Sequence, residues 1–203
     1  MEPTAKKTRN IQNLLLETTI RHIEAYGVDK ISLRKIAAEC GVTHATAYKY
    51  YENKNALIGA TIPYVLAHMY PYINRAVKKA SDEEPFVALL KAYVRYMVKH
   101  PQYHYLLHPD APGQTFWPAG HALYRNSYDG HPYMEIMNGY LEKCKVPKNE
   151  YPLLVPLVSS VVNGLILLAN KHSLVYKGDQ GDLVDLLVLT PLKLKPKGKR
   201  KTR

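Results

Sequence analysis

The side chains best suited to specific chemistry lie in residues 32–54, which read SLRKIAAECGVTHATAYKYYENK. Hydroxyl, amide, imidazole and ammonium groups stand close together in this stretch, and apolar residues recur between them. Hydroxyls and lysines can hold phosphate oxygens, whereas polar side chains on an exposed helix can read the edges of bases. Lys49 can donate to guanine, and Ala45 is small enough to touch the methyl group of thymine. These residue types indicate a DNA-binding surface.

Two short helices are predicted to position these side chains. Ser32 is a suitable N-cap for the first helix, and Gly41 ends it. Thr43 can cap a second helix over residues 44–51. The first helix is expected to brace the second, whose outer face enters the major groove, so the pair forms a helix-turn-helix. The positions expected to face inward are Leu33, Ile36, Ala37, Cys40, Val42, Ala47 and Tyr51.

Helical spacing of apolar residues continues on both sides of this motif, and no strand-like alternation occurs, so the fold class is predicted to be all-α. A helix before the motif ends at Gly27, and Asn53 can cap the next helix, which begins near Asn55. Pro63 and Pro71 are expected to kink or split that fourth helix. The other predicted helices cover 85–99, 101–107, a broken 119–145, 150–172 and 182–189, with a loop at 108–118.

The arrangement resembles the N-terminal pattern of the TetR family of transcriptional regulators. That pattern has a first helix ending in glycine, a capped second helix, a Gly-Val turn, a tyrosine-rich recognition helix and a following lysine. The matching residues, over about residues 9–58, are Gly27, Ser32, Gly41-Val42, Tyr48-Lys49-Tyr50-Tyr51 and Lys54. Ala47 and Tyr51 depart from the residues usual there, and both are core positions, so these departures bear on packing more than on function.

The resemblance implies a role for each exposed position of the motif. The residues implied to contact phosphates are Thr46, Tyr48 and Lys54. The residues implied to face base edges are His44, Ala45 and Lys49. Tyr50 could serve either purpose, Arg34 would reach a base or a phosphate, and Ser32 and Thr43 complete the predicted DNA-binding set. Without the match to this family pattern, residues of these types would more often be ordinary surface or core residues.

The charge of the chain fits a polyanionic partner. It has 28 Lys and Arg against 17 Asp and Glu, a formal charge of +11. Much of the excess falls in residues 193–203, which hold no acidic residue, and a further part in residues 1–60. Nucleic acid is the first candidate partner and an anionic membrane surface the second. The tail, residues 191–203, is predicted to be disordered, and either wraps along DNA or is simply solvated.

Cysteine usage and the N-terminus predict a cytoplasmic protein. Cys40 and Cys144 have no metal-ligand spacing, and the first residues contain no apolar segment of a signal peptide. The stretch from Leu153 to Ala169 is the most apolar. It is expected to be too short and too polar to span a membrane, because it is interrupted by Pro156, Ser159, Ser160 and Asn163.

The predicted domains are a DNA-binding domain at 1–54 and a helical bundle at 55–190, followed by the tail. The family resemblance implies that the bundle binds an effector and forms a homodimer. The helix at 150–172 is apolar on nearly all sides, so it must be buried all round. Either a partner subunit covers one of its faces or neighbours in the same chain cover it completely.

Aromatic residues that cluster along 93–140 could line a pocket for a small organic effector, since apolar walls with a few hydroxyls suit such a ligand. The candidate ligand-binding residues are Tyr93, Tyr96, Tyr103, Trp117, Tyr124, Tyr128 and Tyr140. Ordinary core packing is the alternative for each of them.

Metal binding and catalysis are not predicted. His100, His104 and His108 are spaced by four, with Asp110 nearby, which on one continuous helix would make a metal-binding face. Pro101 and the proline after His108 argue against such a helix. No phosphate-binding loop, nucleophile elbow or paired-cysteine motif occurs, so neither a metal, a cofactor nor an enzymatic activity is expected.

The leading functional hypothesis is a dimeric repressor that binds a pseudo-palindromic operator in double-stranded DNA and is released by a small-molecule effector. The alternative is a DNA-binding regulator without an effector, either constitutive or controlled by a protein partner. A protein held at a membrane surface by its basic tail is the hypothesis from another class.

Overall fold

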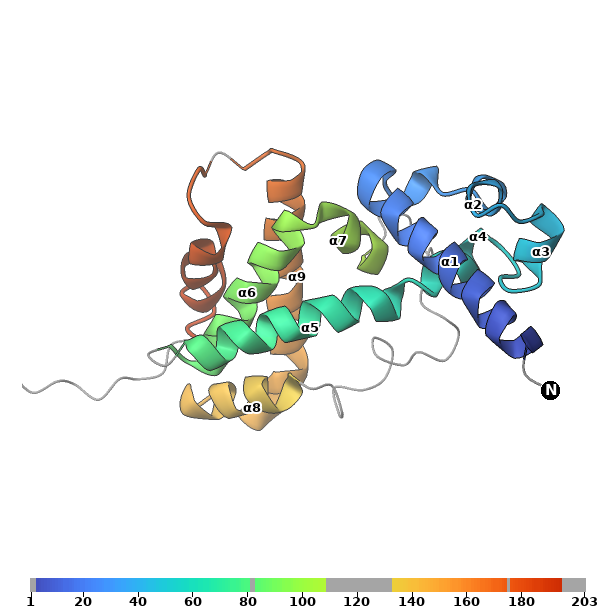
Figure 1. Ribbon diagram of the computed structural model, residues 1–203. Coiled ribbons are helices and arrows are strands. Elements are labelled where there is room, and N and C mark those ends of the chain that lie inside the picture. The colour runs from blue at the N-terminus through green and yellow to red at the C-terminus, as the bar shows by residue number, and fades with distance from the viewer. Residues whose placement is uncertain (1–2, 81–82, 109–132, 175, 195–203) are drawn as a thin grey trace, which may run out of the picture. The chain divides into compact units, whose positions relative to one another are not determined.

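The computed structural model describes residues 3–80, 83–108, 133–174 and 176–194. All regular secondary structure in these ranges is helical, which confirms the predicted all-α class. The chain divides into two compact units (Figure 1). Among the described residues, one unit contains those up to His68 together with 100–108, and the other contains 69–99 and everything from 133 onward.

The first unit contains the predicted helix-turn-helix. Its helices are α1 (Pro3–Tyr26), α2 (Leu33–Glu39), α3 (His44–Tyr48), α4 (Lys54–Gly59), the start of α5 (Ile62–Lys79), and α7 (Pro101–Leu107), with a 3-10 turn at Val28–Lys30. The helix before the motif ends at the predicted residue, because Gly27 has a φ of 87° and its amide donates to the Ile23 carbonyl (2.9 Å). The helix over 101–107 has the predicted bounds, with Pro101 at its first position, where a missing N–H costs nothing.

Some predicted boundaries are wrong by a few residues. The recognition helix α3 ends at Tyr48, not at residue 51. Its chain continues as a tight turn, in which the Tyr50 amide donates to the Ala47 carbonyl (3.0 Å). The fourth helix divides where Pro63 suggested, since α4 ends at Gly59 and α5 begins at Ile62. Pro71, in contrast, does not split α5, which runs on to Lys79.

The second unit packs around α6 (Pro85–Lys99), which has the bounds that its sequence predicted. It contacts α8 (Met134–Lys143), α9 (Tyr151–Asn170) and a 3-10 turn, η3 (Gln180–Asp182). Two ion pairs link α6 to the chain beyond residue 178. Lys91 Nζ lies 2.7 Å from a carboxylate oxygen of Asp185, and Arg95 Nε lies 2.7 Å from a carboxylate oxygen of Asp179. The helix expected at 182–189 ends as a π-helical turn, η4 (Asp185–Leu189), which the Thr190 amide closes on the Asp185 carbonyl (3.0 Å).

The long apolar helix α9 is not buried all round by the described residues of its own chain. Val158, Val162, Leu165 and Ile166 are buried, but Leu153 is 72% exposed. The expectation that this stretch is too short for a membrane is also wrong. By length and composition alone the segment 148–170 would suffice to cross one, as many core helices of water-soluble proteins would.

Candidate nucleic-acid interface

A small apolar core holds the two helices of the motif in place. All four N-terminal helices or their ends contribute to it, and the buried members are Leu15, Leu33, Ile36, Ala37, Ala47, Tyr51 and Leu57. Cys40 and Val42, both expected in this core, are only partly buried and pack at its edge. Because fully burying one large apolar side chain contributes about 1.5–3 kcal/mol, this cluster suffices to fix short helices that would not be stable alone.

Three side chains cap the N-termini of these helices as the sequence predicted. Ser32 Oγ accepts from the Lys35 amide (3.5 Å), Thr43 Oγ1 from the Thr46 amide (3.1 Å), and Asn53 Oδ1 from the Ala56 amide (2.9 Å). Each cap satisfies a backbone donor that the helix itself cannot, a contribution of about 1 kcal/mol. Ser32 and Thr43 therefore serve the fold, whatever else they contact.

The turn between α2 and α3 depends on Gly41. Its φ of 68° lies in the left-handed region, where a side chain would be strained. The amide of Val42, the next residue, donates to the Ala37 carbonyl (3.0 Å) and closes the end of α2. The turn therefore sets the angle at which α3 leaves its supporting helix.

Six of the ten predicted DNA-binding residues are solvent-exposed and are therefore accessible to DNA: Arg34, Thr43, His44, Ala45, Tyr48 and Lys49. Tyr48 is 47% exposed, a high value for so large an aromatic side chain. The rings of His44 and Tyr48, one turn apart on α3, meet edge to face with their centres 4.6 Å apart. The two rings thus contact each other on the outer face of α3, whose opposite side is buried.

The other four predicted residues are half-buried and have partners within the chain. The hydroxyls of Thr46 and Thr43 lie 2.8 Å apart, and Lys54 Nζ donates to the Asp29 carbonyl (3.0 Å). Tyr50 packs partly against the core cluster, and Ser32 is the cap of α2. These residues can still meet a phosphate, but each is already held by the fold.

The electrostatic character of the surface also favours an anion. The one carboxylate on α2, Glu39, is engaged by two groups of α1, Arg21 Nη2 at 3.4 Å and His22 Nε2 at 2.5 Å. Arg34 and Lys49 are exposed and have no carboxylate partner among the ion pairs of the described residues. The face thus presents cations and hydroxyls to solvent.

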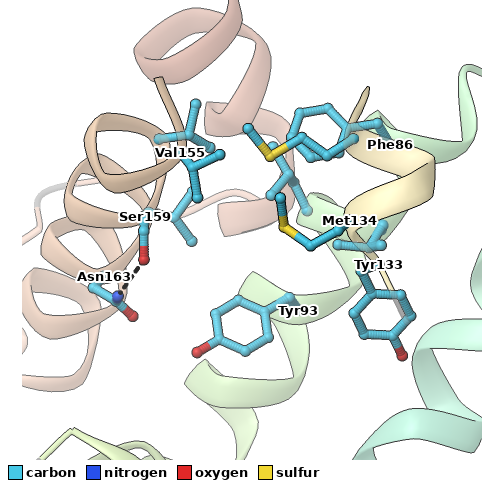
Figure 2. A pocket seen from close by; sticks show the side chains of 12 residues that line it. Phe86, Tyr93, Tyr133, Met134, Val155, Ser159 and Asn163 are labelled. Atoms are coloured by element: carbon cyan, nitrogen blue, oxygen red, sulfur yellow. Dashed lines mark hydrogen bonds between the residues drawn. The ribbon is translucent and has the colours of Figure 1, made fainter. Parts of the chain in front are cut away.

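A pocket in the second unit is the other candidate site. It lies between α6, α8 and α9 and has a volume of about 190 Å³ (Figure 2). Of the predicted ligand-binding residues, Tyr93 lines it, whereas Tyr96 and Tyr140 do not. Tyr96 is buried with its ring 5.3 Å from that of Tyr72, and Tyr140 packs on Phe86 while its hydroxyl donates to the Leu194 carbonyl.

The remaining predicted ligand residues lie elsewhere. Tyr103 belongs to the first unit, where its hydroxyl donates to Glu24 of α1. Trp117, Tyr124 and Tyr128 lie outside the described residues, as do Asp110 and the tail from residue 195.

Sequence reasoning missed most of the pocket, including Met134, Met137, Ser159 and Asn163. One signal was available. Ser159 and Asn163 are polar residues four apart on a predominantly apolar helix, and such a pair on one face points to a site where polarity is needed.

The three histidines do not all lie within one helix. His100 precedes α7 and His108 follows it, so only His104 lies within the helix. Burial, with a smaller contribution from nearby His104, lowers the pKa of His108 to about 4. Within the described ranges, no group of three or more His, Cys, Asp or Glu residues is placed to hold a metal ion.

Comparison with known proteins finds relatives that are similar to part of this chain. Residues 15–61 match the family model for bacterial regulatory proteins of the tetR family. Over 72 residues the chain is 36% identical to the nucleoid occlusion factor SlmA of Pasteurella multocida, covering 36% of each chain. It is 30% identical to the HTH-type transcriptional regulator BetI of Brucella canis over 92 residues, 45% of this chain and 43% of that one. The matches thus span less than half the length of these relatives.

The structure is also similar to one solved structure over nearly its whole length. A protein of unknown function from Rhodococcus sp. RHA1 superposes with a TM-score of 0.65, covering 92% of this chain and 96% of that one. At 23% identity this likeness concerns the fold alone.

Proposed function

We propose that this chain is a regulator of the TetR type, which binds double-stranded DNA through α3 and regulates transcription; the match of residues 15–61 to the tetR family model supports this. The observation that carries the proposal is the outer face of α3. His44, Ala45, Tyr48 and Lys49 are exposed there, while Ala47 on the opposite side is fully buried. A short helix held rigidly from behind and polar in front is what the major groove accommodates.

Each part of this face has a chemical role in the proposal. Lys49 donates to guanine, Ala45 packs on a thymine methyl group, and His44 reads a further base edge. Tyr48 contacts a phosphate, and Arg34 a base or a phosphate. Thr46, whose hydroxyl meets that of Thr43, and Lys54, which donates to the Asp29 carbonyl, also contact phosphates. Phosphate contacts set the register, and base contacts select the sequence.

The proposal includes a homodimer formed through α9 and η4, which are in contact with each other. Large apolar side chains of both elements are exposed: Leu153, Leu157, Leu168, Leu186 and Leu187. Nothing lies within 4 Å of the position that a Cβ on Gly164 would occupy, so a second helix could approach closely there. Several exposed large apolar side chains on adjoining elements are typical of interfaces, and a two-fold dimer would present two recognition helices to a pseudo-palindromic operator.

The proposed mode of action is repression relieved by a small effector, in the cytoplasm and without catalysis. The pocket between α6, α8 and α9 supports an effector because it is a preformed apolar cavity. An effector that binds more tightly to a dimer arrangement that does not fit DNA would shift the population away from the DNA-binding arrangement. A regulator without an effector predicts instead that no pocket ligand alters DNA affinity.

Fluorescence anisotropy with the duplex upstream of the protein's own gene tests DNA binding, with a scrambled duplex as control and a salt series. In the double variant Tyr48→Ala, Lys49→Ala, loss of the Lys49 base contact should remove about 1–3 kcal/mol of specific binding, and loss of the Tyr48 phosphate contact should weaken binding to both duplexes. Lys78→Ala, which removes an exposed charge of the second unit, is the matched control and should bind normally. Unchanged affinity of the double variant at physiological salt would refute binding through α3.

A second duplex series addresses the operator itself. If the protein binds the upstream and scrambled duplexes equally and both affinities collapse with salt, phosphate contacts dominate. Genome-wide selection of bound fragments would then find the operator, and failure to enrich any sequence would contradict a sequence-specific regulator.

A further inference from the structure

The pocket of the second unit has one polar end in an apolar wall. Ten of its twelve lining residues are aliphatic, aromatic or thioether-bearing, and the other two are Ser159 and Asn163 of α9. Figure 2 shows these two together with the Tyr93 hydroxyl at one end, and Phe86 and Met134 toward the other. A ligand that fills this space must therefore have a polar end and an apolar body.

The amide of Asn163 has unused hydrogen-bonding capacity. Its Nδ2 donates to Ser159 Oγ (3.3 Å), whereas its Oδ1 is buried and has no partner in the described part of the chain. A buried acceptor without a partner is costly, and most such groups in proteins are satisfied by protein, water or ligand. A hydroxyl group on a ligand would supply the missing donor once the amide turns toward the pocket.

The lining also limits the charge and size of the ligand. None of the twelve lining residues is Lys, Arg, His, Asp or Glu, so an ionised ligand would lose its hydration without gaining a counter-charge. An apolar cavity of about 150 Å³ is known to hold benzene, and the present volume of about 190 Å³ leaves room for a ring with a small substituent. Phe86, Tyr93 and two methionines favour an aromatic ring as the body.

We infer that this pocket binds small, uncharged, single-ring phenols or aromatic alcohols, with their hydroxyl at the Asn163 amide and their ring against Phe86 and Met134. The inference deepens the proposed function, on which it rests for its regulatory meaning, since it names the chemical class of the effector. It does not depend on DNA binding for its test.

Isothermal titration calorimetry of the full-length protein, in the absence of DNA, compares three probes of matched shape. 4-Ethylphenol should bind saturably, and ethylbenzene, which lacks the hydroxyl, should bind about tenfold more weakly, the value of one hydrogen bond. 4-Ethylbenzoate, ionised at neutral pH, should give no measurable heat. Absence of saturable 4-ethylphenol binding, or equal binding of the benzoate, would overturn the inference.

Two variants locate the site. Asn163→Leu keeps the size of the side chain but removes the amide, and should reduce 4-ethylphenol to the affinity of ethylbenzene. Ser160→Ala, a neighbouring exposed hydroxyl that bonds only its own helix at Pro156, is the matched control and should bind all probes as the unaltered protein does. Retained preference for the phenol in Asn163→Leu would place the site elsewhere and overturn the assignment.

The half-buried Val155 provides a second route if Asn163→Leu fails to fold. Val155→Phe should fill the cavity from its edge and weaken both 4-ethylphenol and ethylbenzene at least tenfold. Because these titrations contain no DNA, phenol binding by a protein that binds no operator would refute only the regulatory function. Operator binding without phenol binding would refute only the ligand class.

Discussion

The helix-turn-helix and the long helix α9 differ in the kind of surface that they expose to solvent. Helix α3 has only five residues, and its buried side is covered by neighbours close in the sequence, so its polar face is free for DNA. Helix α9 has twenty residues, and the described chain covers only one of its faces, which leaves leucines in solvent. Under the proposed function, the exposed polar face of α3 meets DNA, whereas the exposed apolar face of α9 meets a second copy of the chain.

The largest expected effect tests that difference on α9. Leu157→Glu should convert a dimer into a monomer of 23.1 kDa, because each unpaired carboxylate buried in an apolar interface costs about 3–5 kcal/mol and a two-fold interface buries two. Light scattering after size exclusion measures the mass. Ser173→Glu, which places the same charge at an exposed site beyond the helix, should leave the dimer intact. A dimer that survives Leu157→Glu would show that this face is not the interface.

The same substitution in the two regions should have unequal effects on stability. Leu57→Ala, at a fully buried position of the first unit, should lower the free energy of unfolding by about 2–5 kcal/mol, as cavity-forming changes do. Leu153→Ala, 72% exposed on α9, should barely change it under conditions where the protein is monomeric. Denaturant titration followed by circular dichroism gives both values, and equal losses would contradict the contrast between the regions.

A pH series is expected to weaken the first unit through His108. Its pKa is about 4 in the folded protein, against about 6.5 when unfolded, because burial disfavours the charged form. The unfolded state therefore binds more protons below pH 6.5, and stability falls from there toward pH 4 by about 3 kcal/mol in total. The His108→Gln variant should not show this part of the decrease in unfolding free energy between pH 6.5 and pH 4. If the variant and the unaltered protein lose stability in parallel, His108 is not the group responsible.

The smallest expected effect concerns the cap of α3. Thr43→Ala should cost about 1 kcal/mol, because the Thr46 amide loses its acceptor, whereas Thr43→Ser should cost much less. Thermal unfolding measures both changes, and DNA affinity should follow the same order, since the cap orients the recognition helix. Equal stability of the two variants would mean that solvent replaces the hydroxyl without loss.

Local signals made the first unit largely predictable. Caps, glycine turns and helical spacing act over three or four residues, so Ser32, Gly41, Thr43 and Asn53 could be assigned their places from sequence. The bounds of α6 and α7 followed in the same way from Pro85 and Pro101. The end of α3 was harder to predict, because the chain leaves the helix through a turn that no residue type announces.

The pocket could not be predicted in the same way, because its walls come from α8 and α9 together with α6, which precedes them by more than thirty residues. Tyrosine content suggested the region but not the residues: among the predicted residues that the structure describes, Tyr93 alone lines the pocket. Tyr96 and Tyr140 have the same composition-based signal and pack elsewhere.

The all-α class, the helix-turn-helix and six of the exposed residues of that motif followed from the sequence, because hydrogen bonds and periodicity between near neighbours encode them. Three features depend instead on tertiary packing: Thr46 and Lys54 are held by other residues of the fold, one face of α9 is left uncovered by the described chain, and Ser159 and Asn163 form the polar end of a pocket. Those outcomes depend on which distant segments pack together, and that is settled by shape and burial summed over the whole chain.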